Sequence, residues 1–166
     1  ELKLRHINLK LLLVNAPDSI IKQAENSIYS NDIVIIDRIK GDYNLSIAYT
    51  VIDIFMLIAE QGESFGYVST ESLLCETPIV SLNTPWADNS QAEVIGNNVG
   101  GVLVNNIKAL IEEVDFLIEN KSKRNKLGKS GRERIITKYN YLKIAERAIE
   151  VTLSDDINNC IYNPNN

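Results

Sequence analysis

Two glutamates eight residues apart bracket the segment of this chain with the clearest chemical content. Glu63 precedes a short loop that holds Gly66, and Glu71 lies in the helix-like stretch that follows. The loop comes after an apolar run, 53–58, and backbone amides at such a strand–loop–helix junction can bind an anion. Acids that flank an anion site suit a ligand with both phosphate and hydroxyl groups, such as a nucleotide-sugar.

Gly66 and the two residues after it are the candidate phosphate contacts. Glycine lets the chain approach a ligand closely. The amides of Gly66, Tyr67 and Val68 would be unpaired donors at the start of a helix, where the macrodipole adds positive potential. A tight strand-to-helix turn with solvated amides would give the same pattern, so the residues alone leave both interpretations open.

The two acids differ in how much the sequence says about them. On a helical wheel over residues 67–76, Glu71 falls near the middle of an apolar arc, where a carboxylate is costly unless it is paired or binds a ligand. We therefore expect Glu71 to accept from ligand hydroxyls or to make a buried structural bond. Glu63 is either a solvated loop acid or a sugar contact. The arc consists of Tyr67, Val68, Leu74 and Cys75.

Apolar runs alternate with helix-like stretches along the whole chain. Strands are predicted at 10–15, 32–37, 53–58, 78–82 and 102–104. One predicted helix begins at Asp18, and another begins at a capping box, 90–93. Further helices are predicted at 45–51, 67–76, 107–118, 122–138 and 141–153. Strands that are apolar throughout indicate a parallel sheet covered on both faces. Right-handed crossovers make this an open, doubly wound α/β domain, whose ligands bind at the carboxyl ends of strands.

Composition argues against several other functions. With 166 residues, 45% hydrophobic and 23% charged, the chain fits one globular domain with a core. The net charge of −5 gives no general case for nucleic-acid binding. A single histidine, His6, and two distant cysteines argue against a Ser-His-Asp triad and against a metal site. We expect reduced thiols, no transmembrane helix and a cytoplasmic location.

Three features have two interpretations each. Residues 121–138 carry a net charge of +7, which suits either an anionic membrane surface or a solvated helix that balances an acidic body. Trp86 either borders a sugar site or shapes its own loop. The last helix, 141–153, packs either on the core of this domain or against another domain.

Residues 63–80 resemble the Glu-x7-Glu signature of the retaining group 1 glycosyltransferases. That family commonly reads Glu-Gly-Phe-Gly-x4-Glu-Ala-x-Ala-x-Gly-x-Pro-Val-Val, and this chain reads Glu-Ser-Phe-Gly-Tyr-Val-Ser-Thr-Glu-Ser-Leu-Leu-Cys-Glu-Thr-Pro-Ile-Val. Ser72 and Thr77 replace the usual Ala and Gly. Upstream, 51–57 is similar to Ala-Asp-x-Phe-Val-Leu-Pro. Downstream, 91–96 with 100–104 is similar to Pro-Glu-Val-Ile followed by Gly-x-Leu-Val. Several motifs in the right order make the resemblance specific.

The resemblance implies one half of a two-domain fold. Residues 1–153 would be the Rossmann-like, donor-binding domain, 154–166 a flexible tail, and the amino-terminal acceptor domain would lie outside this chain. Glu71 would then bind the ribose hydroxyls and Glu63 the transferred sugar, in the catalytic position. The amides of Gly66, Tyr67 and Val68 would hold the phosphates. The loop 38–41, through Ile39 and Lys40, would meet the base.

The resemblance also implies an activity, with partners. The enzyme would transfer a hexosyl group from a nucleotide-diphosphate sugar with retention, without a metal or cofactor, in polysaccharide or glycoconjugate synthesis. The acceptor would be lipid-linked or at a membrane surface, and the fragment would be inactive alone. Two alternatives remain open: a non-catalytic α/β interaction module, and a hydrolase or epimerase of the same architecture.

Overall fold

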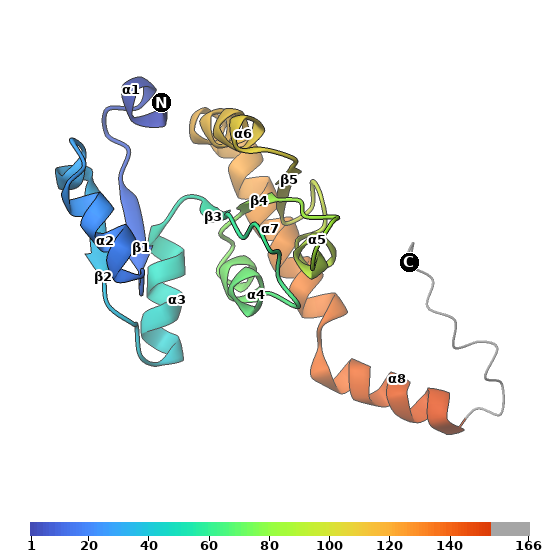
Figure 1. The fold of residues 1–166 in the computed structure, drawn as a ribbon. Coiled ribbons are helices and arrows are strands. Elements are labelled where there is room, and N and C mark those ends of the chain that lie inside the picture. Colours follow the sequence, from blue (N-terminus) through green and yellow to red (C-terminus); the bar gives the residue numbers. More distant parts are fainter. Residues whose placement is uncertain (154–166) are drawn as a thin grey trace.

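The computed structural model describes residues 1–153, in which helices and strands alternate (Figure 1). The elements are α1 (Leu2–Arg5), β1 (Leu11–Val14), α2 (Asp18–Glu25), a 3-10 turn (Ser30–Asp32), β2 (Ile33–Ile36), α3 (Asp42–Val51), β3 (Phe55–Leu57), α4 (Tyr67–Leu74), β4 (Ile79–Leu82), α5 (Ser90–Ile95), β5 (Gly101–Val104), α6 (Ile107–Glu119), α7 (Lys121–Lys138) and α8 (Tyr141–Leu153). Every strand pairs in parallel, which confirms the predicted α/β class. The predicted tail lies outside the described residues.

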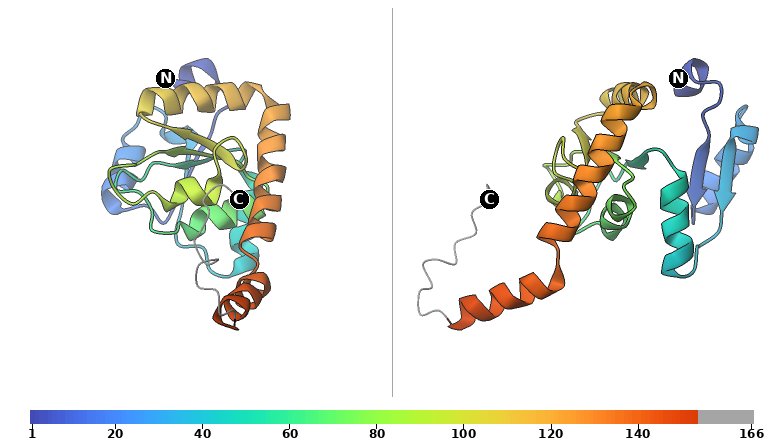
Figure 2. Two further views of the ribbon diagram at one scale, coloured as in Figure 1. Left: turned by 90° about the vertical axis from the view of Figure 1, so that its right-hand side faces the viewer. Right: turned by 180° about the vertical axis from the view of Figure 1, so that it is seen from behind.

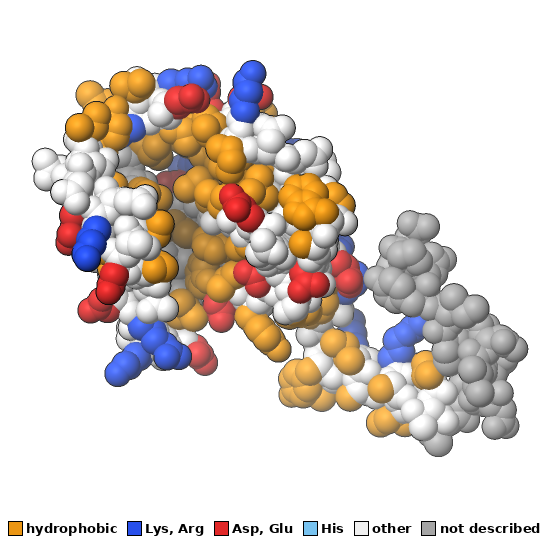
Figure 3. Space-filling view, viewed as in Figure 1, with side chains coloured by type: hydrophobic (Ala, Val, Ile, Leu, Met, Phe, Trp, Pro, Cys, Tyr) orange, Lys and Arg blue, Asp and Glu red, His pale blue; other side chains and the backbone are white. Residues whose placement is uncertain are grey.

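The strands form two sheets where the sequence predicted one. β1 pairs with β2, and β3, β4 and β5 pair in that order. The β1–β2 pair stands apart from the rest with α2, and α3 runs between the two sheets (Figure 2). Hydrophobic side chains line the hollow between the two parts (Figure 3). The carboxyl ends of β3, β4 and β5 nevertheless share one edge, as parallel pairing requires.

The core of the larger part lies on both faces of the three-stranded sheet. One cluster forms against α6 and includes Val80, Leu82, Leu110, Leu117 and Leu127. The other forms against α4 and α5 and includes Leu73, Ile79, Val94, Ile95 and Ile135. β4 is buried along its whole length, which explains why its sequence does not alternate between apolar and solvent-facing polar residues; its one polar side chain, Ser81, is fully buried as well.

The buried face of α4 is the opposite of the predicted one. Ser69, Ser72 and Leu73 are fully buried, whereas Tyr67 is 74% exposed and Leu74 39%. The reason is α7, which packs closely against this helix. A Cβ on Gly128 would lie 1.9 Å from the carbonyl oxygen of residue 76, and one on Gly131 would lie 2.6 Å from the side chain of residue 73. The close approach of α7 therefore buries the side of α4 that carries Leu73, together with Ser69 and Ser72, so the wheel prediction is wrong.

Two smaller predictions are also corrected. Asn89, not Ser90, occupies the N-cap of α5 and makes no side-chain cap bond, so the predicted capping box is wrong. α8 projects away from the rest (Figure 1), and Ile144 and Ile149 are exposed, so this helix does not pack on the core of this domain.

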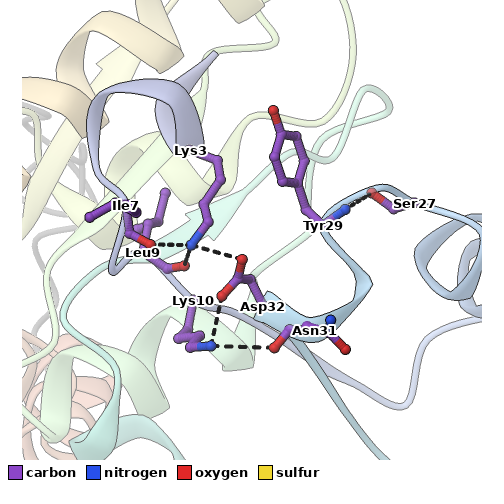
Figure 4. Close-up of polar contacts among 8 residues, drawn as sticks. All are labelled: Lys3, Ile7, Leu9, Lys10, Ser27, Tyr29, Asn31 and Asp32. Atoms are coloured by element: carbon purple, nitrogen blue, oxygen red, sulfur yellow. Dashed lines mark hydrogen bonds and ion pairs between the residues drawn. The ribbon is translucent and has the colours of Figure 1, made fainter.

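Two ionic clusters fasten the amino-terminal stretch. Lys3 and Lys10 lie 2.8 and 2.7 Å from the carboxylate of Asp32, before β2 (Figure 4). Arg5 and His6 lie 2.5 and 2.6 Å from the carboxylate of Asp115 on α6. Hydrogen bonds from His6 and then Arg5 hold the pKa of Asp115 below its usual value of 3.8. The second cluster therefore ties the first residues of the chain to the larger part.

Asp115→Asn is expected to reduce the acid sensitivity of the fold. Because the pKa of Asp115 is lower in the folded chain than in the unfolded one, its contribution is present at neutral pH and is lost below about pH 4. Urea unfolding at about pH 6 and about pH 3 checks this expectation. The unaltered chain should lose more stability between the two conditions than the variant does. Glu112→Gln, an exposed change on the same helix, is the control, and equal losses in all three chains would contradict the prediction.

Candidate functional site

The predicted site occupies the junction between β3 and α4. The chain leaves the carboxyl end of β3 through a loop and enters α4 at Gly66, the N-cap residue. Gly66 has φ +77° and ψ 64°, the left-handed conformation that glycine adopts without steric cost. Its carbonyl accepts from the amide of Ser69 at 2.9 Å, which closes the first turn of the helix.

Several donors at this turn have no partner. Within residues 1–153, no acceptor is found for the amides of Gly66, Tyr67 and Val68. The hydroxyl of Ser69 is fully buried and also lacks a partner in the described part of the chain. The hydroxyl oxygen of Ser69 lies 3.4 Å from the position that a Cβ on Gly66 would take. Unpaired amides at the positive end of a helix, with a hydroxyl beside them, form a turn that can hold an anion.

Glu63 lies directly beside this turn. Its Cβ would be 3.5 Å from a Cβ placed on Gly66. Its amide donates to Oε1 of Gln91 at 3.0 Å, and its carbonyl accepts from the amide of Ser90 at 3.2 Å, so the start of α5 fixes the backbone. The carboxylate of Glu63 has no hydrogen bond or ion pair with any other described residue. It therefore has both oxygens available to a ligand.

Glu71 lies further along α4 and is half-buried. Its Oε2 accepts a hydrogen bond of 3.1 Å from the hydroxyl of Tyr49 on α3. Burial, together with the charge and the hydrogen bond of Glu71, raises the pKa of Tyr49 far above its usual value of 10. The tyrosine is thus a protonated donor at neutral pH. One of the two interpretations left open by the sequence, a structural bond, is therefore present at one oxygen of Glu71.

The loop predicted to meet the base follows β2, in the two-stranded sheet, and not a strand of the β3–β5 sheet. Arg38 to Gly41 follow the carboxyl end of β2, where a cavity of about 490 Å³ opens beside Ile39, Lys40 and Leu45. The carbonyl of Lys40 accepts from the side-chain amide of Asn44 at 3.1 Å. No hydrogen bond or ion pair between described residues joins this loop to Glu63 or Glu71.

A second cavity, of about 400 Å³, opens at the carboxyl ends of β4 and β5. Glu60, Gln61, Asn105 and Trp86 are among the residues that line it. Trp86 is 70% exposed. It therefore borders a cavity instead of packing inside its own loop, and this cavity adjoins the loop that carries Glu63.

Three residues of the site were not predicted from the sequence: Tyr49, Ser69 and Gln91. Gln91 is buried and donates to the hydroxyl of Thr84 at 2.8 Å, and it also holds the Glu63 loop. The sequence around Tyr49 and Gln91 gave no signal, because each belongs to the site through a contact 22 or 28 positions away. The burial of Ser69 likewise follows from tertiary packing and not from its neighbours in the sequence.

Half of the basic side chains of α7 make structural contacts. Arg124 donates to carbonyls at the end of α6, Arg134 to carbonyls of α5, Arg132 to the carbonyl of residue 74, and Lys138 pairs with residue 93. The other half have no partner within the described part of the chain: Lys121, Lys123, Lys126 and Lys129. No helix within residues 1–153 is both long and apolar enough to cross a bilayer.

Parallel strands alternating with helices, with the site at their carboxyl ends, define a Rossmann-like α/β domain. Solved structures of similar fold include a mutant of TarM from Staphylococcus aureus in complex with UDP, with a TM-score of 0.74 and 17% identity over 92% of this chain and 31% of that one. HepE from Anabaena, in complex with UDP-glucose, has a TM-score of 0.69 and 16% identity over 86% of this chain and 40% of that one. The carboxyl-terminal domain of LpcC from Francisella tularensis has a TM-score of 0.59 and 19% identity over 74% of this chain and 62% of that one.

The sequence identifies the family. The model of the glycosyl transferases group 1 family matches residues 1–134, so the chain belongs to the group 1 glycosyltransferases. A curated relative, the capsular polysaccharide biosynthesis glycosyltransferase CapM of Staphylococcus aureus, is 27% identical over 143 residues. The match covers 80% of this chain and 34% of CapM, so the chain spans about a third of the length of this relative. Membership of the group 1 family, which the motifs suggested, is confirmed.

Proposed function

We propose that this chain is the donor-binding half of a glycosyltransferase that acts on a nucleotide-diphosphate sugar. The observation that carries the proposal is the junction between β3 and α4. There, unpaired amides and the buried Ser69 hydroxyl lie beside the free carboxylate of Glu63, with Glu71 on the same helix. Amides at a helix start suit a diphosphate, and carboxylates suit the hydroxyls of ribose and sugar. The UDP complex of TarM and the UDP-glucose complex of HepE support this assignment.

Each residue has one role in this proposal. The amides of Gly66, Tyr67 and Val68 hold the diphosphate and stabilise the negative charge that it gains as a leaving group. Glu71 accepts from the ribose hydroxyls. Glu63 accepts from hydroxyls of the transferred sugar, and its charge stabilises the positive charge that develops on the sugar ring when the glycosidic bond breaks. No metal is required, because the amides and the macrodipole already complement the diphosphate.

The remaining parts of the donor follow from the fold. The base lies in the cavity at Arg38 to Gly41, against the backbone of Ile39 and Lys40. The transferred sugar lies beside Glu63, toward the cavity that Trp86 borders. Transfer proceeds with retention in this proposal, as the Glu-x7-Glu spacing of Glu63 and Glu71 suggests.

The whole enzyme requires a second domain. We propose that this domain holds the acceptor and that the product is a polysaccharide or glycoconjugate, which the likeness to CapM supports. We place the enzyme in the cytoplasm, with the four unpartnered lysines of α7 toward an anionic membrane surface that carries the acceptor.

Binding of nucleotides to the 166-residue chain tests the proposal. UDP, GDP and ADP are compared with their nucleosides and with inorganic diphosphate at equal ionic strength. One nucleoside diphosphate is expected to raise the melting temperature by about 5–10 °C at a hundredfold excess over its Kd. The matching nucleoside should give a smaller shift, because it lacks the groups that meet the amides. Absence of a shift with all three diphosphates would overturn the proposal.

A further inference from the structure

We propose that Tyr49 is a positioning residue for ribose recognition. Its hydroxyl holds one oxygen of the Glu71 carboxylate, so that the other oxygen is oriented toward the ribose hydroxyls. The two residues lie 22 positions apart, on α3 and α4, so the ribose contact depends on two helices instead of one. The inference rests on the proposed function, because it concerns how the same site recognises the nucleotide.

Tyr49 is itself fixed on several sides. It is 8% exposed, and its ring lies edge-on to that of Phe55 on β3, with 5.7 Å between centroids and 82° between planes. Its carbonyl accepts from the hydroxyl of Thr77 at 2.6 Å, just before β4. A buried tyrosine has only two side-chain torsions, and here both the ring and the backbone are held. The hydroxyl is therefore a fixed point near α4.

Glu71 needs such a fixed point. A half-exposed glutamate has three side-chain torsions, and a ligand that binds it must immobilise them, which weakens binding. The hydrogen bond from Tyr49 to Oε2 restricts the side chain before the ligand arrives. Oε1 makes no hydrogen bond or ion pair with another described residue, so it is the oxygen available to ribose. Because Tyr49 is protonated at neutral pH, it donates to Glu71 and does not compete with the ligand as an acceptor.

This arrangement has a specific consequence for the choice of ligand. A site whose polar groups are held in place for a hydroxyl discriminates strongly against an analogue that lacks it, because those groups are then left unpaired. A mobile carboxylate can turn to water instead and discriminates less. Tyr49 should therefore affect the preference for ribose over dideoxyribose. A residue that serves packing alone should change both affinities equally.

The test compares two ligands on three chains. The ligands are the nucleoside diphosphate that binds best among UDP, GDP and ADP, and its 2′,3′-dideoxy analogue. The chains are the unaltered one, Tyr49→Phe and Thr77→Val, each with Kd measured by calorimetry. Tyr49→Phe is expected to weaken the ribonucleotide about tenfold and the dideoxy analogue less than about twofold. The phenylalanine retains the ring that packs against Phe55, so the variant is expected to fold.

Thr77→Val is the matched control. It also removes one buried hydroxyl that bonds to Tyr49, but at the backbone and away from the carboxylate. It should lower the melting temperature and change the ratio of the two Kd values much less than Tyr49→Phe does, because the Tyr49 hydroxyl still donates to Glu71. A change in that ratio as large as that of Tyr49→Phe would assign the effect to general loosening of α3 and would overturn the inference.

Other outcomes separate this inference from the proposed function. Equal weakening of both ligands by Tyr49→Phe, or no weakening of the ribonucleotide, overturns the positioning role. The proposed function survives that result if Glu71→Ala still abolishes the ribose preference. If none of the three diphosphates binds the unaltered chain, both the proposed function and the role of Tyr49 fail.

Discussion

Glu71→Ala is expected to weaken binding of the nucleoside diphosphate by about 10- to 100-fold. Hydrogen bonds to a charged group contribute about 1.5–3 kcal/mol, and the variant removes the only carboxylate assigned to ribose. The buried face of α4 is formed by Ser69, Ser72 and Leu73, so the fold should survive. Calorimetric titration with the diphosphate, on the unaltered chain and on the variant, measures the change.

Two comparisons make this result specific. Glu119→Ala removes an exposed acid at the end of α6, and its Kd should match that of the unaltered chain, which excludes an effect of net charge alone. Glu71→Ala also leaves the Tyr49 hydroxyl without its acceptor, so the ligand-free variant should melt a few degrees lower. A rise in melting temperature caused by the ligand must therefore be measured from the melting temperature of the same variant without ligand. An unchanged Kd in Glu71→Ala would remove Glu71 from the site.

Gly128→Ala is expected to destabilise the folded chain by about 2–3 kcal/mol. The added Cβ would lie 1.9 Å from a backbone oxygen at the end of α4, a contact that only movement of a helix can relieve. In an exposed helix interior the change from glycine to alanine would instead stabilise the folded chain by up to about 1 kcal/mol. The sign of the change in stability therefore shows whether Gly128 lies in a close contact. Thermal unfolding should show a fall of about 5–10 °C in melting temperature.

Lys129→Ala is the matched control for this change. It alters the next residue of α7, on the exposed side, and should change stability by less than about 0.5 kcal/mol. If Gly128→Ala were as stable as Lys129→Ala, the close approach of α4 and α7 would be refuted. The orientation of α4 would then need another explanation.

The elements of this fold are visible in the sequence because each depends on neighbouring residues. The run at 33–36 is apolar throughout, the run at 79–82 is apolar except for Ser81, and both form parallel strands. The division into two sheets is not visible, because it depends on which strand edges meet. The orientation of α4 was misjudged for a similar reason. A helical wheel weighs hydrophobicity, whereas the packing here depends on Gly128 and Gly131 of α7, which lie in a distant part of the chain.

The site shows the same division between local and distant information. Gly66 with its flanking acids is a local pattern, and the structure places Glu63 beside the turn, with Glu71 on the helix that follows. The contact of Glu63 with Gln91 spans 28 positions and that of Glu71 with Tyr49 spans 22. No spacing rule connects such pairs. The residues proposed to touch the ligand thus form a local pattern in the sequence, while those that hold them in place do not.

The separate hydrogen-bond ladders of the two sheets have a consequence for how the molecule opens. The β1–β2 pair shares no hydrogen-bond ladder with β3–β5, so we expect it to open as a unit with its own local opening free energy. α3 is covalently part of the connection between the two units, and its Tyr49 bonds to Glu71 on the other side. A nucleotide with its base at the β2 loop and its ribose at Glu71 would span both units. Binding of the nucleotide would then be thermodynamically linked to the cooperativity of unfolding. The bound ligand would join the two units, so that they would unfold together.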